Sequence, residues 1–174
     1  MTLQGLLKCM DSKSLAEVSV SDICREAKLS RPTFYRLFDS PTDVVRWGCD
    51  RTYEGLVSSE PEDASAFNPQ LAMHYILSHS QAIECAVRNH RTDIVQASMA
   101  RYLSPVLTHY LTMTECDSDP ECLLSMMFGA LSALLSAWVA GGRRQSEEDL
   151  IRSAREFSDI LRKIISFITP SVHF

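Results

Sequence analysis

The stretch of residues 19–45, SVSDICREAKLSRPTFYRLFDSPTDVV, decides the fold of this chain. Near its start, Ser19 is followed three residues later by Asp22, a pattern typical of the first turn of a helix. The hydroxyl can accept from a free backbone amide, and the carboxylate lies at the positive end of the helix. The pattern therefore predicts a helix over residues 20–27.

A second, shorter helix follows the link of residues 28–30. Ser30 can cap it, and beyond Ser30 the apolar and polar side chains fall on opposite faces. The face predicted to pack on the core carries Phe34, Leu37 and Phe38. The face predicted to project outward carries Arg31, Thr33, Tyr35 and Arg36. Two helices joined by so short a link, the second basic and aromatic, indicate either a helix-turn-helix or a surface helix on an ordinary helical bundle.

This second helix is basic although the chain as a whole is acidic. The 174 residues hold 17 Lys and Arg against 22 Asp and Glu, a formal net charge of −5. Residues 27–38 nevertheless contain Lys28, Arg31 and Arg36 and no carboxylate. Any polyanion is therefore expected to bind locally, on this short basic segment. The side chains suit a nucleic acid, because Arg and Thr can reach base edges or phosphates and Tyr35 can bond a phosphate.

The rest of the chain also predicts helices, and strand signals are nearly absent, so the expected fold class is all-α. The apolar spacing and the cap residues predict helices over residues 3–11, 41–57, 68–90, 92–100, 102–113, 122–142 and 150–168, with a polar loop at 58–69. Neither an internal repeat nor a low-complexity tract interrupts this pattern.

Residues 122–142 form a run of 21 residues without a charge, so a membrane span is one alternative for them. Small side chains recur there at every fourth position, and they are Ser125, Gly129, Ala133, Ala137 and Gly141. Such a ridge allows close helix contact in lipid or in a soluble core. We expect a soluble helix that is buried on all sides, since this gives the same pattern.

The last predicted helix carries apolar residues at alternating steps of four and three, the spacing of a heptad seam. Further apolar residues widen its face, so the helix is expected to contact both its own subunit and a neighbour. A homodimer follows. The residues expected in its interface are Gly129, Ala133, Ala137, Leu150, Phe157, Leu161 and Ile164.

The six cysteines form no CxxC pair, and no signal-peptide pattern precedes them, so a cytoplasmic protein with small, buried thiols is expected. Cys116 and Cys122 flank a turn and are the expected exceptions. The five histidines show no metal-ligand spacing, and the chain lacks nucleophile-elbow, phosphate-loop and dinucleotide motifs. We therefore expect no enzyme, no metal and no cofactor.

A ligand pocket among the later helices is one of two interpretations for a set of apolar and polar residues; burial in an ordinary core is the other. His79 lies on one helical face with Ile76 and Ile83, where it is either a hydrogen-bonded core group or the polar anchor of a pocket. The candidate pocket residues are Met73, His79, Ile83, Met99, Tyr102, Met126 and Met127. Their chemistry predicts a small, mostly hydrophobic ligand.

The quoted stretch resembles the DNA-binding segment of TetR-type (tetracycline-repressor-like) bacterial transcription regulators. The resemblance rests on the Ser-capped helix, the AKLS turn and the TFYRLF motif, and it covers roughly the first 57 residues. It implies a DNA-binding domain over residues 1–47 and a helical effector-binding and dimerisation domain over 48–174. It also implies a ligand-responsive repressor that binds a palindromic operator as a homodimer.

The resemblance places DNA contacts at Ser30, Arg31, Thr33, Tyr35 and Arg36, and core positions at Phe34 and Phe38. The chain departs from the family pattern in three places, one of which is that the first predicted helix begins almost at the first residue, without the basic arm that many relatives have. Lys28 occupies a turn position normally held by Gly, where a positive φ costs about 1 kcal/mol, and its side chain can compensate by reaching a phosphate. Pro41 stands where the family often has a phosphate-binding Lys.

Two alternatives to an operator-binding repressor stay open, one from these departures and one from the uncharged run at residues 122–142. The first is a co-regulator of the same fold that acts mainly through a protein partner, with weak or no direct operator binding. The second is a small membrane-anchored helical protein, which solubility without detergent would exclude. For the repressor, the expected partners are double-stranded operator DNA, a second copy of the chain and a small, mostly hydrophobic effector, with no membrane.

Overall fold

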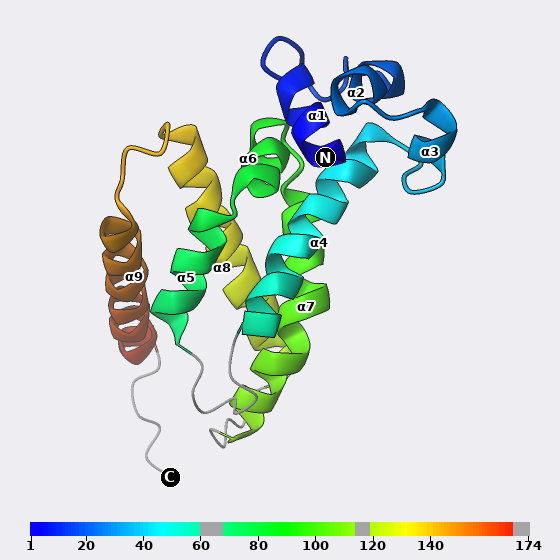
Figure 1. Ribbon diagram of the computed structural model, residues 1–174. Coiled ribbons are helices and arrows are strands. Elements are labelled where there is room, and N and C mark those ends of the chain that lie inside the picture. Colours follow the sequence, from blue (N-terminus) through cyan, green and yellow to red (C-terminus); the bar gives the residue numbers. More distant parts are fainter. Residues whose placement is uncertain (60–67, 114–118, 169–174) are drawn as a thin grey trace.

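The computed structural model describes residues 1–59, 68–113 and 119–168, and within them it shows nine helices and no strand (Figure 1). The all-α fold class is confirmed. The helices are α1 (Thr2–Cys9), α2 (Val20–Ala27), α3 (Arg31–Tyr35), α4 (Pro41–Ser59), α5 (Pro69–Ser78), α6 (Gln81–Arg88), α7 (Thr92–Met113), α8 (Pro120–Ala140) and α9 (Glu147–Ile168). Of the predicted loop at 58–69, residues 60–67 lie outside the described residues, and Ser58 and Ser59 belong to α4.

The two short helices of the helix-turn-helix begin where the sequence predicts. The Ser19 hydroxyl accepts from the Asp22 amide at 3.2 Å, and the Asp22 carboxylate accepts from the Ser19 amide at 3.1 Å. These reciprocal bonds form a capping box, which fixes the start of α2. The Ser30 hydroxyl accepts from the Thr33 amide at 3.2 Å and fixes the start of α3 in the same way.

The first three helices close on the start of α4. Leu6 of α1, Ile23 of α2 and Phe34 of α3 are fully buried together with Val44 of α4. Helices α1 and α2 approach closely at Gly5, where a Cβ atom would lie 2.8 Å from the Ala27 Cβ. Only the smallest side chains fit at this crossing.

The expectation that Leu37 shares the buried face of α3 is wrong. Leu37 is 60% exposed, whereas Phe34 is buried and Phe38 half-buried. Helix α3 ends at Tyr35, so Leu37 lies beyond the last turn and no longer follows its periodicity. Phe38 packs edge-on against Trp47, with 6.0 Å between the ring centroids.

Helix α4 joins the N-terminal helices to the rest of the molecule (Figure 1). It contacts α1 near its start and then packs along α6 and α7. The predicted domain boundary, between residues 47 and 48, falls inside this continuous helix. A second connection runs through Asn89, just beyond α6, whose side chain accepts from the Leu15 amide at 3.0 Å and donates to the Cys85 carbonyl at 2.8 Å.

Two predicted helix boundaries in the C-terminal part are wrong. The single helix expected over 68–90 is broken at His79 and Ser80 into α5 and α6, because side chains take over local hydrogen bonding there: Thr52 donates to the His79 carbonyl at 3.0 Å, and Ser80 donates to Glu84 at 2.6 Å. The two helices expected over 92–100 and 102–113 are instead the single helix α7. It continues through Pro105 while packing against α4 and α8.

Helix α8 is buried on one face only, so the expectation of burial on all sides is wrong. Its inward face packs Leu124, Phe128, Leu135 and Trp138 against the bundle, and its other face is exposed. By length and composition, α8 is the one described helix that could cross a membrane, and a third of its most apolar window is buried in the protein. Neither property distinguishes a span from a surface that another protein covers.

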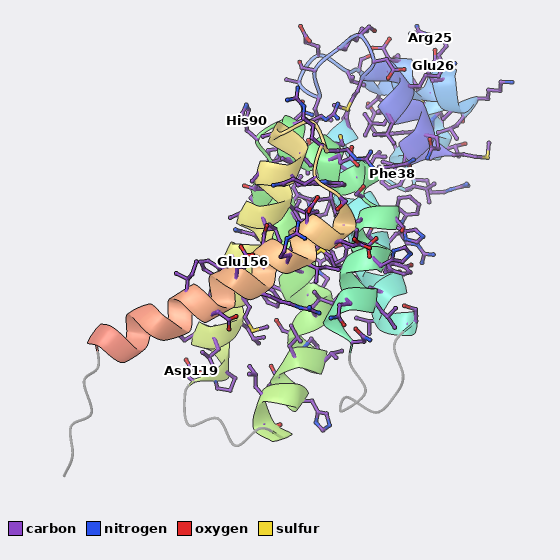
Figure 2. All side chains as sticks on the ribbon, turned by 90° about the vertical axis from the view of Figure 1, so that its left-hand side faces the viewer. Arg25, Glu26, Phe38, His90, Asp119 and Glu156 are labelled. Atoms are coloured by element: carbon purple, nitrogen blue, oxygen red, sulfur yellow. The ribbon has the colours of Figure 1, made fainter. Side chains whose placement is uncertain are left out.

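Helix α9 is anchored at its beginning and then leaves the bundle. Leu150 is fully buried beside Trp138 and Val139 of α8, and α9 packs on α5. Figure 2 shows α9 crossing the other helices and extending beyond them. Phe157 and Ile160, further along α9, are 53% and 55% exposed.

The cysteines behave largely as predicted. Cys9, Cys24, Cys49 and Cys85 are free and buried, which confirms their role as small core residues, and burial raises the pKa of the Cys85 thiol to about 11. Cys122 is free and exposed, as expected for an exception, and Cys116 lies outside the described residues.

Candidate nucleic-acid interface

The turn between α2 and α3 is a left-handed one centred on Lys28. This residue has φ 54° and ψ 43°, and the next amide, that of Leu29, donates back to the Cys24 carbonyl at 3.0 Å. The strained turn predicted for a residue other than Gly is thus present in the structure. It leaves the Lys28 side chain exposed immediately before α3.

The predicted contact residues of α3 lie on the surface. Ser30, Arg31, Tyr35 and Arg36 are exposed and Thr33 is half-buried, while Phe34 is fully buried beneath them. The Ser30 and Thr33 hydroxyls lie 2.8 Å apart, so they bond each other while Ser30 caps the helix. The structure therefore brings the six predicted DNA contacts, Lys28 among them, to the turn and the exposed side of α3.

The basic side chains of this region divide into two groups. Four of them are paired with carboxylates: Lys8 with Glu26, Lys13 and Arg25 with Asp22, and Arg46 with Asp43. Lys28, Arg31 and Arg36 have no ion pair among the residues that the structure describes. The positive charge that is free to meet a polyanion thus lies on the turn and on α3.

Asp22 is the centre of the paired group. It accepts from Lys13 at 2.8 Å, from the Ser19 hydroxyl at 2.7 Å and from Arg25 at 2.9 Å. The Lys13 ammonium and the Ser19 donors hold the pKa of this carboxyl well below its usual range. A charged Asp22 therefore stabilises the start of α2, which positions the helix-turn-helix.

We expect Asp22→Asn to lower the melting temperature at neutral pH. We also expect the melting temperature of this variant to fall less steeply than that of wild type as the pH is lowered. Because the pKa of Asp22 is depressed in the folded state, its stabilisation is complete above about pH 4 and is lost as the pH falls below that value. Melting by circular dichroism at a series of pH values checks this. Asp11→Asn, at an exposed carboxyl, is the control. If the melting temperatures of wild type and Asp22→Asn fall equally steeply in acid, Asp22 does not supply this pH-dependent stability.

The candidate pocket residues do not share one place. Met73, Ile83 and Met99 are buried and Tyr102 is half-buried. By contrast, His79 is exposed at the break between α5 and α6, so it is not an anchor inside the bundle. Met126 and Met127 are 57% and 45% exposed on α8, so they too lie outside an interior pocket.

Sequence reasoning missed Tyr53, a polar group in the core. This side chain of α4 is fully buried, and its hydroxyl has no hydrogen-bond partner among the residues that the structure describes. Burial raises the pKa of Tyr53 well above its usual range. A buried hydroxyl without a partner is uncommon, and α4 gave no sign of it because Tyr53 follows the apolar spacing of the helix.

The residues predicted to form the dimer interface differ in their exposure in the single subunit. Ala133, Ala137 and Phe157 are exposed and Gly129 is half-buried with open space above it. Leu150 is fully buried within its own subunit, so its assignment to the interface is wrong; the first turn of α9 is used to anchor that helix. Leu161 and Ile164 belong to α9, but their side chains lie outside the described residues.

A helix-turn-helix that exposes unpaired cations on its second helix defines a DNA-binding transcription regulator. Residues 3–46 match the family model of the bacterial regulatory proteins of the tetR family, which identifies this N-terminal segment as a domain of that type. The crystal structure of Lin0861 from Listeria innocua is similar over the whole fold, with a TM-score of 0.65. The sequences are 16% identical, over 92% of this chain and 90% of that one. No curated protein matches the chain.

Proposed function

We propose that this protein is a ligand-responsive repressor that binds a palindromic operator as a homodimer in the cytoplasm, without enzymatic activity. The observation that carries the proposal is the group of three unpaired cations, Lys28, Arg31 and Arg36, in an N-terminal region whose other basic side chains are paired with carboxylates. The proposed domains are residues 1–47 for DNA and residues 48–174 for effector and dimer contacts. Phosphate contacts orient the protein, and contacts to base edges select the sequence.

Dimerisation is supported by the apolar surface on α8 and α9. The exposed side of α8 carries small residues beside Met126 and Met127, and α9 adds Phe157 and Ile160. So much adjoining apolar surface is unusual for a soluble monomer. A second copy of the chain would cover these helices and place two α3 helices for two half-sites of an operator.

Effector binding is supported by the Tyr53 hydroxyl. A small ligand with one polar group among apolar atoms would satisfy this hydroxyl and contact the core formed by α4 and α7, where Met99 is buried. Such a ligand would bind the folded protein alone and raise its melting temperature with concentration. The proposed effector is therefore small and mostly hydrophobic.

We expect Arg36→Ala to weaken binding to the DNA upstream of the protein's own gene. Loss of a phosphate contact would lower affinity on every sequence, whereas loss of a base contact would cost about 1–3 kcal/mol and relax one position. Fluorescence anisotropy with the upstream fragment and an unrelated fragment distinguishes the two.

The matched control is Arg144→Ala, since Arg144 is also exposed and has no ion pair among the described residues, but follows α8, far along the chain from the helix-turn-helix. Its affinity should stay at the wild-type value. If Arg36→Ala binds the upstream fragment as tightly as the control, α3 is not the recognition helix.

A further inference from the structure

A groove of about 430 Å³ opens where the N-terminal helices meet the C-terminal ones. It lies beside the break between α5 and α6, which sequence reasoning did not foresee, and α1 and α4 supply its other side. The residues that give it chemical character are Leu3, Trp47, Arg51, Tyr75, His79 and Gln81. Its volume lies within the range of roughly 300–1,000 Å³ typical of small-molecule sites.

The groove offers flat aromatic surfaces to a ligand. Tyr75 and His79 stack on each other, with 4.2 Å between ring centroids and 20° between ring planes. Trp47 is 44% exposed on α4. Exposed aromatic rings that are already held by neighbours bind a planar apolar group at low cost in side-chain entropy.

The polar groups of the groove include both an acceptor and donors. The His79 Nδ1 lies 2.9 Å from the Tyr75 carbonyl oxygen, which can only accept, so Nδ1 carries the proton and a neutral His79 presents Nε2 as an acceptor. The Gln81 side chain accepts from Gln4 at 2.8 Å through its oxygen, which leaves its NH₂ group to donate.

The charged group of the groove is Arg51. Among the described lining residues it is the one with a permanent charge, and none of them is a carboxylate. Arg51 donates to Glu54 at 2.8 Å, a contact on the surface that uses part of its five N–H donors. The guanidinium can therefore also receive a ligand carboxylate, for which its planar fork is suited.

From these features we propose that the groove binds a small aromatic carboxylate: the ring lies on the aromatic side chains, and the carboxylate pairs with Arg51. The floor of the groove is closely packed, because a Cβ atom on Gly48 would lie 2.6 Å from the Ala82 Cβ. The site is distinct from the core around Tyr53, and it takes an anion where the core would take a mostly hydrophobic molecule.

The test uses 2-naphthoate as the probe and 2-naphthamide as its uncharged counterpart, with calorimetric titration of the full chain. We expect saturable binding of 2-naphthoate with a dissociation constant below about 1 mM, and at least about tenfold weaker binding of the amide. Arg51→Gln should weaken 2-naphthoate about tenfold, and His79→Leu should also weaken it. Arg144→Gln, which removes an exposed cation elsewhere, should bind as wild type does.

Binding is measured without DNA, so the outcome is independent of the proposed regulatory function. Equal affinity of the acid and the amide, or wild-type affinity in Arg51→Gln, would overturn the carboxylate site. No saturable binding of 2-naphthoate up to about 10 mM would overturn it as well.

Discussion

Phe157→Asp is expected to dissociate the proposed dimer into monomers and to weaken operator binding at least about a hundredfold. In the separate subunit Phe157 is 53% exposed, so a carboxylate there leaves the fold intact. In a closed dimer the same carboxylate would be buried without a partner, which costs several kcal/mol. A monomer presents one recognition helix to a two-fold operator and loses half of its contacts.

Size-exclusion chromatography with light scattering measures the first effect, and anisotropy with operator DNA measures the second. Ala137→Phe tests the α8 side of the same contact, because a bulky ring there would hold the two subunits apart. Ala100→Phe, on the exposed side of α7, is the control and should remain dimeric. If Phe157→Asp and Ala137→Phe both remain dimeric, α8 and α9 do not form the interface. A wild-type chain that is extracted only with detergent would instead favour a membrane location for α8.

Gly5→Val is expected to destabilise the N-terminal helices by about 3 kcal/mol and to abolish DNA binding before the rest of the protein unfolds. A Cβ at this position meets the Ala27 Cβ at 2.8 Å and the Ala27 amide nitrogen at 3.0 Å. A backbone atom cannot rotate away, so α1 and α2 must separate. Ala27 directly precedes the Lys28 turn, and the separation therefore displaces α3.

Thermal unfolding followed by circular dichroism, together with DNA binding well below the midpoint, checks this expectation. Gln4→Val places the same side chain one residue earlier, on the exposed side of α1, and should change the stability by less than about 0.5 kcal/mol. If Gly5→Val melts as the Gln4 variant does, the close crossing of α1 and α2 does not exist in solution.

The helix-turn-helix could be predicted from sequence because its signals are local. Ser19 with Asp22 and Ser30 with Thr33 fix both helix starts through bonds within three residues. The break at His79 could not be predicted, since it depends on Thr52, which lies 27 positions earlier and donates to the His79 carbonyl. Apolar periodicity continues across the break and conceals it.

The candidate sites show the same limit. The exposed cations of α3 follow from the alternation of apolar and basic residues within one short helix. The exposure of Met126 and Met127 does not, because a helix that is apolar all round gives no indication of which side faces the bundle. The inward side of α8 is set by contacts with α6 and α7 that depend on the whole fold.

Asn89 links α6 mechanically to the loop before α2. Its one amide group holds the Leu15 backbone in the loop before α2 and the Cys85 backbone near the end of α6. If α6 shifts, it must either pull this loop along or leave the Leu15 amide unpaired, which costs about 1–3 kcal/mol. The Asn89 side chain therefore transmits a displacement of α6 to the loop before α2 while both hydrogen bonds hold. Once either bond breaks, the displacement is no longer transmitted through this side chain.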